Sequence, residues 1–320
     1  MIKLNNVKVQ YKDKIAVDIK DEIVLEDAHK IGIIGSNGAG KSTLIKAILG
    51  LVNYSGSISS DIPKEKIAVH MQFNNYSETV KTKDIIQMIT NKKIESDENL
   101  MDLIKYFDFE KLLHKSFKKL SGGEKQKLTL ILVMWQNSPV TIFDEVTTGL
   151  DFVSRQSLME KIVEYYKDKS TTILMVSHYY QELEDICDKL LYLHEGKVLF
   201  YGKKREMFLK YCTSSVILTE KNKITESLIP KDIRLEAMEN KIAAGFHDLN
   251  TEKKLISSLV DNDQQFERLN DSIELTVLNA LKKEGAKLWT NTFLSLKQSY
   301  FYKTLQVYFS EWYFQYWCRF

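Results

Sequence analysis

Residues 35–43 form a glycine-rich segment whose composition and spacing are suited to binding phosphate. The segment fits the pattern GxxxxGK[ST] and reads Gly35-Ser36-Asn37-Gly38-Ala39-Gly40-Lys41-Ser42-Thr43. Glycines allow backbone N–H groups to turn inward around phosphate oxygens at positions where a Cβ would clash. In this pattern Lys41 reaches the β- and γ-phosphates and the Ser42 hydroxyl ligates Mg²⁺. The segment therefore predicts a site for the phosphates of a nucleotide.

Two adjacent carboxylates end an apolar stretch further along the chain. Residues 140–143 are mainly hydrophobic, and Asp144 and Glu145 follow them directly. Asp144 is placed to hold Mg²⁺, usually through water. Glu145 is one residue on and points elsewhere, so it is suited to orienting or deprotonating a water that attacks phosphate. Alone this would be an ordinary acidic turn, but together with residues 35–43 it indicates hydrolysis.

Short apolar runs and helical stretches alternate around these residues. Residues 31–34 form a short apolar run that enters the glycine-rich segment, and residues 43–49 then have helical spacing. Residues 140–143 and 173–176 are further continuous apolar runs, as in a parallel sheet covered on both faces. A helical pattern follows each run, so we expect an α/β fold built from βαβ units.

Composition bounds the class of protein. The chain has 320 residues, 44% of them hydrophobic and 28% charged, with a net charge of +2. The near-neutral charge gives no sign of a nucleic-acid partner. Cys187, Cys212 and Cys318 lie far apart, which argues against a disulfide framework and fits a reducing compartment. No run of 18 apolar residues and no apolar N-terminal segment occur, so we expect neither a membrane span nor a secretion signal.

The segment at residues 120–126 resembles the signature of ABC-type ATPases. It reads Leu-Ser-Gly-Gly-Glu-Lys-Gln and lies between Lys41 and Asp144, in the order of that family. The resemblance covers about residues 1–205. It implies a P-loop NTPase core of ABC type, which combines a parallel sheet with antiparallel N-terminal strands. A helical subdomain at about residues 75–135 is added to this core. It also implies ATP and Mg²⁺ as the bound cofactors.

Further residues match the family's pattern in order along the chain. Tyr11 is similar to the aromatic residue that stacks on adenine. Gln72 is similar to the glutamine that senses Mg²⁺ and couples to the membrane partner. Residues 147–151, Thr-Thr-Gly-Leu-Asp, resemble the D-loop. His178, which follows the apolar run 173–176 and Ser177, is similar to the histidine that contacts the γ-phosphate.

The signature also has a direct physical interpretation. Ser121, Gly122 and Gly123 precede a helix that we expect from Glu124 onward, so they predict a second anion-binding helix N-terminus. In the resembling family this end meets the γ-phosphate held by another subunit, so two nucleotide-binding domains are needed. The chain has one, which implies a homodimer or a paralogous ATPase partner.

One position departs from the family's pattern. Val146 stands where the residue after the catalytic glutamate is usually proline. Valine lacks the fixed φ of proline and keeps its N–H, so we expect a looser turn at Glu145 but retained activity.

Residues 177–188 and 191–202 are similar to the corresponding region of bacterial drug and peptide exporters, which pair with separate six-helix permeases. The resemblance implies export of a drug, lipid or antimicrobial peptide through such a permease, at the cytoplasmic face of the cell membrane. The alternative is a soluble ABC-type ATPase acting on ribosomes or nucleic acid. Such proteins usually carry two nucleotide-binding domains or a long coiled coil, and the sequence shows neither.

The remaining chain carries no motif. We expect an ATPase domain at residues 1–205, a small accessory α+β or helical domain at 206–288, with a β-like stretch at 215–218, and an aromatic-rich segment at 289–320. The last segment is too polar to span a bilayer. It is either an amphipathic helix packed on a domain or partner, or a helix lying in the membrane interface.

Overall fold

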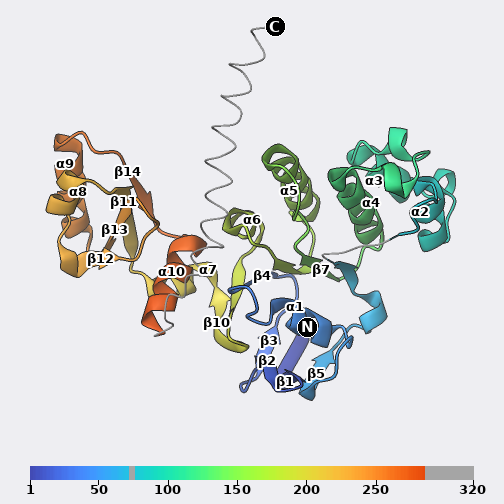
Figure 1. Ribbon diagram of the computed structural model, residues 1–320, viewed down its shortest axis with the longest axis horizontal. Helices are drawn as coiled ribbons and strands as arrows, with labels where there is room; N and C mark the ends of the chain where they lie inside the picture. The colour runs from blue at the N-terminus through green and yellow to red at the C-terminus, as the bar shows by residue number, and fades with distance from the viewer. Residues whose placement is uncertain (72–75, 285–320) are drawn as a thin grey trace, which may run out of the picture. The chain divides into compact units, whose positions relative to one another are not determined.

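The structure is a computed structural model that describes residues 1–71 and 76–284. It divides into two compact units, Met1–Lys203 and Lys204–Phe320 (Figure 1). The predictions for Gln72 and for residues 289–320 lie outside the described residues. Among the described residues, no helix combines the length and apolar composition needed to cross a bilayer.

An antiparallel sheet opens the first unit. Its central strand β1 pairs with the other three strands, each in the antiparallel direction. Side chains of β1 alternate between buried and more exposed positions, with Ile2, Leu4, Val7 and Val9 facing the core. The strands are β1 (Ile2–Tyr11), β2 (Lys14–Asp18), β3 (Ile23–Leu25) and β5 (Ser55–Ser60).

A six-stranded sheet forms the centre of the first unit, in the order β10-β9-β4-β8-β7-β6. All its pairs are parallel except β10 with β9. Every residue of β7 and β8 is buried, which explains their continuous apolar sequences. The strands are β4 (Lys30–Ile34), β6 (Ala68–His70), β7 (Val140–Asp144), β8 (Thr172–Val176), β9 (Lys189–His194) and β10 (Lys197–Lys203).

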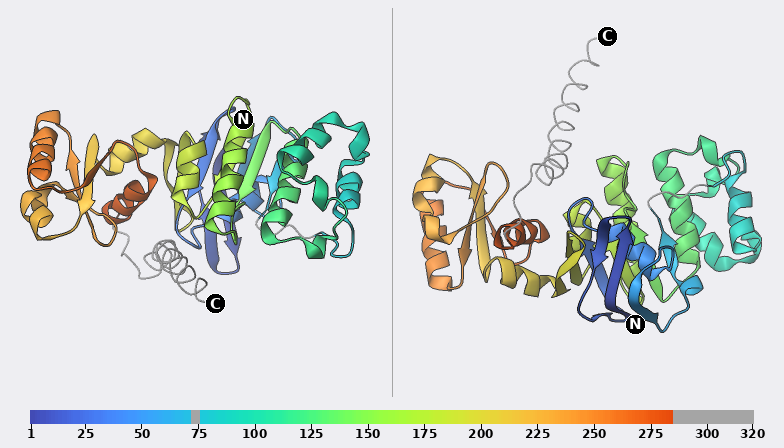
Figure 2. Two further views of the ribbon diagram at one scale, coloured as in Figure 1. Left: turned by 90° about the horizontal axis from the view of Figure 1, so that it is seen from above. Right: turned by 60° about the horizontal axis from the view of Figure 1, so that its bottom comes forward.

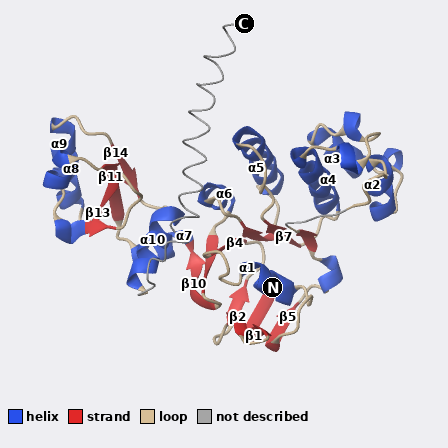
Figure 3. Cartoon of the chain, in the orientation of Figure 1, coloured by secondary structure: helices blue, strands red, loops and turns tan. Residues whose placement is uncertain are grey.

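Helices follow the central strands, as the βαβ pattern predicted. Helix α1 comes after β4, α5 after β7 and α6 after β8, so parallel neighbours are joined by crossovers (Figure 3). The carboxyl ends of β4, β7 and β8 therefore meet at one edge of the sheet. The elements are α1 (Lys41–Ile48), α5 (Phe152–Tyr166), α6 (Tyr180–Ile186) and the short 3₁₀ turn η1 (Lys64–Lys66).

A helical region lies between β6 and β7 in the sequence. Its helices pack around α4, and the Trp135 indole of α4 donates to Asp97, which also caps α3 at the N–H of Leu100. Its elements are α2 (Thr82–Thr90), η2 (Ile94–Ser96), α3 (Glu98–Tyr106), η3 (Glu110–Leu112), η4 (Phe117–Lys119) and α4 (Gly122–Trp135). The predicted ABC-type fold class, with antiparallel N-terminal strands, parallel core and helical subdomain, is confirmed.

The second unit contains a four-stranded antiparallel sheet in the order β12-β13-β11-β14 (Figure 2). Chain order and strand order together make a split β-α-β arrangement. Ile217 and Ala244 face a cluster with α8 and α9, whereas Val216 and Ala243 face a cluster with α7 and α10. The elements are α7 (Lys204–Tyr211), β11 (Ser215–Glu220), α8 (Lys223–Leu228), η5 (Lys231–Ile233), β12 (Arg234–Leu235), β13 (Lys241–Phe246), α9 (Leu249–Asp261), β14 (Phe266–Leu269) and α10 (Ile273–Lys283).

Candidate active site

The glycine-rich segment forms the loop between β4 and α1. Gly35 has a φ of 152° and Gly40 a φ of 105°, conformations that residues with a Cβ rarely adopt. A Cβ would lie 2.2 Å from the Leu193 carbonyl oxygen at Gly35, and 2.3 Å from that of Ala16 at Gly40. The loop thus passes close to neighbouring backbone, and only glycine fits at both positions.

The helix that follows this loop begins without a side-chain cap. Gly40 is its N-cap residue, no side chain accepts a hydrogen bond from the first amides, and the first turn holds no acidic residue. The amides and the positive end of the helix dipole are thus available to an anion. Asn37 and Gly38 are exposed at the loop tip, while Thr43 is half-buried in the first turn.

Lys41 folds back over the same loop. Its Nζ donates to the carbonyl oxygens of Gly35 at 2.7 Å and Ser36 at 3.1 Å. The side chain is 7% exposed, and burial lowers the pKa of Lys41, although the carboxylates of Glu145 and Asp144 act in the opposite direction. The ammonium group is therefore held where the loop would enclose a phosphate.

Ser42 and Asp144 are brought together from distant parts of the sequence. The Ser42 hydroxyl donates to Oδ1 of Asp144 at 3.4 Å, and burial raises the pKa of Asp144. Among the described residues, no cluster of three or more His, Cys, Asp or Glu side chains could hold a metal. One hydroxyl and one carboxylate fit Mg²⁺, which keeps several waters and binds through few carboxylates plus substrate phosphates.

Glu145 and His178 meet at the ends of the neighbouring strands β7 and β8. His178 Nε2 lies 2.8 Å from Oε1 of Glu145, and the Thr148 hydroxyl donates to Oε2 at 3.2 Å. The hydrogen bond from His178 lowers the pKa of Glu145, and burial opposes this shift. Although Glu145 is only 8% exposed, its lowered pKa makes it an ionised acceptor near neutral pH.

The backbone at Glu145 is in the left-handed region, with a φ of 55°. For a residue with a side chain this conformation costs about 1–2 kcal/mol. The turn is held on both sides, since the Glu145 N–H donates to the Val176 carbonyl oxygen at 3.0 Å and the Thr148 N–H donates to that of Glu145 at 3.2 Å. Val146, 1% exposed, packs into the core below it.

The signature segment begins helix α4 in a different way from the prediction. The helix starts at Gly122, not at Glu124. Ser121 accepts from the Glu124 N–H at 3.3 Å, and Glu124 accepts from the Ser121 N–H at 2.7 Å, which is a reciprocal capping box. This cap favours a helical start at Gly122 and Gly123 despite the low helix propensity of glycine.

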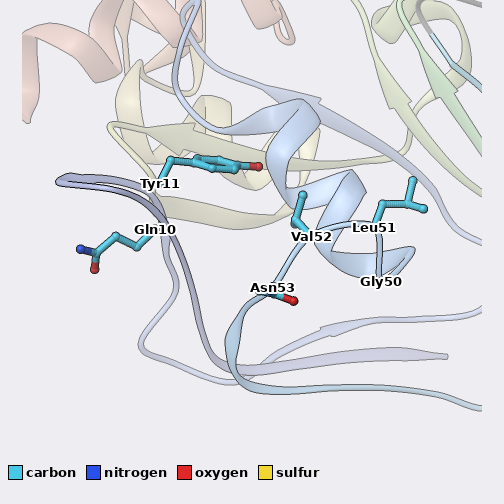
Figure 4. Close-up of a pocket in the computed structure, with 6 residues that line it drawn as sticks. All are labelled: Gln10, Tyr11, Gly50, Leu51, Val52 and Asn53. Carbon is cyan, nitrogen blue, oxygen red and sulfur yellow. The ribbon is translucent and has the colours of Figure 1, made fainter.

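Tyr11 lies at the end of β1 and is 47% exposed. It lines a pocket whose opposite wall follows the C-terminal end of α1, away from Lys41 at its start (Figure 4). An eight-residue helix spans about 12 Å, so the far wall is distinct from the phosphate loop. The pocket is lined by Gln10, Tyr11, Gly50, Leu51, Val52 and Asn53. The role of Tyr11 in stacking on adenine stays a prediction.

A further buried carboxylate, for which the sequence predicted no role, lies close to the candidate catalytic residues. Glu182 on α6 is 4% exposed and accepts hydrogen bonds from both Thr147 and Ser177. It lies four residues after His178 in the sequence, within the helix that begins at Tyr180. That spacing was the only available signal, because glutamates are common on exposed helix faces.

Comparisons with known proteins agree with this geometry. The family model "ABC transporter" matches residues 21–148. The energy-coupling factor transporter ATP-binding protein EcfA1 of Mycoplasmopsis synoviae is 30% identical over 226 residues, covering 65% of this chain and 84% of that protein. The methionine import ATP-binding protein MetN of Clostridioides difficile is 27% identical over 314 residues, covering 90% of this chain and 95% of that protein.

A relative matched over a shorter stretch and a solved structure add to these comparisons. The teichoic acids export ATP-binding protein TagH of Lactococcus lactis is 31% identical over 192 residues, covering 58% of this chain and 40% of that protein. A solved ATP-binding subunit of an ABC transporter superposes with a TM-score of 0.59 at 24% identity, over 66% of this chain and 93% of the other. The chain therefore belongs to the ABC transporter family, as an ATP-binding subunit and an ATPase.

Proposed function

We propose that this chain hydrolyses ATP at a site shared with a second ATPase subunit and drives a separate membrane permease at the cytoplasmic face of the cell membrane. The observation that carries the proposal is the convergence of two pairs, Ser42 with Asp144 and Glu145 with His178, at the carboxyl ends of adjacent strands. The phosphate loop opens at the same edge of the sheet.

Binding of ATP uses the loop and its lysine. The open amides at the start of α1 donate hydrogen bonds to phosphate oxygens, and Lys41 transfers its own from the loop carbonyls to the β- and γ-phosphates. Ser42 and Asp144, with Gln72 from outside the described residues, would hold Mg²⁺. The bound ion would neutralise charge on the phosphate oxygens.

Glu145 and His178 act on the water and the γ-phosphate. A water oxygen forms a bond to the γ-phosphorus while the bond from that phosphorus to the bridging oxygen breaks, which releases ADP and inorganic phosphate. His178 contacts one oxygen of the Glu145 carboxylate and the Thr148 hydroxyl donates to the other, which fixes the orientation of this acceptor. The lowered pKa of Glu145 favours orienting the water over removing its proton early.

The second subunit would supply the signature segment. Ser121, Gly122, Gly123 and Glu124 lie at the start of α4, and the nearest neighbour of a Cβ built at either glycine is the Leu150 side chain. That helix end carries partial positive charge, which suits the γ-phosphate of ATP held by another copy. ATP would thus join two subunits, which are identical or paralogous.

The chemistry is tested by Glu145→Gln, which keeps the shape of the side chain and removes its charge. We expect turnover by the purified full-length chain to fall by about 10²–10⁴-fold, while ATP binding persists. Glu195→Gln is a matched control, because Glu195 also has a positive φ, of 47°, but is exposed and lies outside the site. Turnover of Glu145→Gln within twofold of the unmodified chain would remove Glu145 from this role.

For the cargo we propose export of a drug, lipid or antimicrobial peptide. The exporter-like residues 177–202 support this direction, as does the similarity to a protein named for teichoic acid export. The names of the methionine import and energy-coupling factor relatives favour uptake instead. An experiment that distinguishes export from uptake is therefore needed.

Deleting the gene for this chain in its host distinguishes export from uptake. Export predicts increased sensitivity to a panel of cationic peptide antibiotics and lipophilic dyes, with growth on limiting nutrients unchanged. A growth defect that excess methionine relieves, without altered sensitivity, would overturn export in favour of uptake.

Tagged chain purified from detergent-solubilised membranes should bring along a permease. Recovery of ribosomal proteins without a membrane protein would instead support the soluble ATPase alternative.

A further inference from the structure

The carboxylate of Glu182 connects the two segments that carry Glu145 and His178. The Thr147 hydroxyl donates to its Oε1 at 2.7 Å, and the Ser177 hydroxyl donates to its Oε2 at 2.5 Å. Thr147 lies two residues after Glu145, and Ser177 lies directly before His178. One buried side chain therefore fixes the backbone positions next to both members of the pair.

The guanidinium group of Arg155 lies near this carboxylate. Arg155 Nε on α5 is 3.7 Å from Oε1 of Glu182, and the guanidinium carbon stacks 3.7 Å from the centre of the Tyr179 ring. Burial raises the pKa of Glu182, whereas the hydrogen bonds from Ser177 and Thr147 and the charge of Arg155 lower it. A buried carboxylate is stable only when its oxygens are fully satisfied, so loss of either hydroxyl disturbs the cluster.

The cluster is tied to the catalytic segments by backbone bonds as well. The Ser177 hydroxyl oxygen also accepts from the Tyr179 N–H at 2.9 Å, which bridges across His178. The Leu150 N–H donates to the Thr147 carbonyl oxygen at 3.2 Å, which folds the turn at residues 147–150. Movement of either segment is thus resisted through Glu182, independently of the direct contact between Glu145 and His178.

The geometry points to Glu182 as a positioning residue that sets the distance between Glu145 and His178 and holds the turn at 147–150 in place. This inference rests on the proposed hydrolytic roles of Glu145 and His178. Glu182 bonds to Thr147 and Ser177, the residues beside this pair, so it acts on turnover by keeping the two backbone segments in register. Its removal should slow the chemical step while leaving nucleotide binding at the α1 end unchanged.

The second unit offers a chemically matched control. Glu252 is 2% exposed, accepts from the Ser215 hydroxyl at 2.9 Å and pairs with Arg268. It therefore shares with Glu182 a buried carboxylate, a serine donor and an arginine partner, but the second unit carries none of the site residues. Glu252→Gln therefore shows how much turnover changes when a buried carboxylate of this kind is lost away from the site.

The experiment compares Glu182→Gln with Glu252→Gln in the full-length chain. Glutamine keeps one acceptor oxygen, but its amide nitrogen cannot accept the second hydroxyl. We expect kcat per folded molecule to fall about 10- to 100-fold in Glu182→Gln, with affinity for a fluorescent ATP analogue within twofold. Glu252→Gln should leave both quantities within twofold, whatever it does to the melting temperature.

A second pair of variants keeps the test valid if Glu182→Gln does not fold. Thr147→Ser retains the donor hydroxyl and should keep kcat within threefold, whereas Thr147→Val removes it and should lower kcat about 10-fold. The inference is overturned if Thr147→Val, or a folded Glu182→Gln, turns over as fast as the unmodified chain. An unmodified chain that binds ATP without hydrolysing it would instead refute the proposed function.

Discussion

Two helix ends in this chain are proposed to meet phosphate, and they are built differently. Helix α1 begins after Gly40 with no side-chain cap and no acidic residue in its first turn. Helix α4 begins after Ser121 with a capping box, and Lys115 donates to the Glu124 carboxylate at 3.1 Å. The first end leaves its amides open, whereas the second satisfies part of its own polar groups.

The difference indicates how each end is used. An uncapped, glycine-lined end is ready for phosphate in a single chain, because nothing must be displaced. The capping box occupies the N–H groups of Ser121 and Glu124 and leaves those of Gly122 and Gly123 for other acceptors. The α4 end is therefore stable without nucleotide, which suits the proposal that ATP reaches it only with a second subunit.

Alanine at the two helix ends should give the largest contrast. In Gly40→Ala the new Cβ would lie 2.3 Å from the Ala16 carbonyl oxygen, at a φ of 105°, so the loop must shift. We expect affinity for a fluorescent ATP analogue to fall about 10- to 100-fold, the loss of one or two charge-assisted hydrogen bonds. In Gly123→Ala the nearest atom is the Leu150 Cδ2 at 3.8 Å, and affinity should stay within twofold.

Equilibrium titration of each purified variant measures this contrast, and circular dichroism checks that both fold. Equal losses of affinity would show that the α4 end contributes to nucleotide binding within one chain. Turnover should fall in both variants, because Gly123→Ala places a methyl group where a partner's phosphate is proposed to lie.

Removing the cap of α4 should have an intermediate effect. Ser121→Ala deletes the acceptor of the Glu124 N–H, so the free energy of unfolding should fall by about 1 kcal/mol. Ser272→Ala is the control, since Ser272 caps α10 in the second unit by accepting from the Leu275 N–H at 3.3 Å. Urea unfolding gives both values. Turnover per folded molecule should fall only in Ser121→Ala, and an equal fall in Ser272→Ala would point to general destabilisation.

The smallest expected effect is a pH dependence of the free energy of unfolding that comes from Glu124 at the start of α4. Burial raises the pKa of Glu124, but hydrogen bonds from the Ser121 N–H and from Lys115 outweigh it and lower the pKa below its ordinary value of 4.5. A carboxyl whose folded-state pKa is lowered stabilises the fold above the unfolded value and loses this contribution as the pH falls. Unfolding free energies of the unmodified chain and Glu124→Gln should therefore converge below pH 4.5. If the unfolding free energies of the two proteins instead differ by the same amount at every pH, Glu124 makes no pH-dependent contribution to stability.

Much of the site could be predicted because its signals are local. Residues 35–43 are contiguous, and their glycines, lysine and serine each have a role that depends on the backbone beside them. Ser42 and Asp144 were each expected to hold Mg²⁺, and the structure brings the two side chains within 3.4 Å of each other. The expected start of α4 at Glu124 was wrong by two residues, because the capping box of Ser121 and Glu124 begins the helix at Gly122.

Other features left no readable pattern. Strands β13 and β14 were missed, since β13 includes small residues such as Ala243 and Ala244, and β14 is short and half exposed. Glu182 was missed because its sequence neighbours resemble any polar helix. Its importance depends on hydroxyls contributed by Thr147 and Ser177, which are distant from each other in the sequence.

Residue types and their spacing were enough to identify the family, the phosphate loop and the candidate catalytic residues, because each of these depends on a short stretch of backbone. The contact of Glu145 with His178, the link through Glu182 and the contrast between the open α1 end and the capped α4 end appear only in the folded chain. Buried carboxylates and helix ends are satisfied by whichever hydrogen-bonding groups the fold brings near them, and these groups come from distant parts of the sequence.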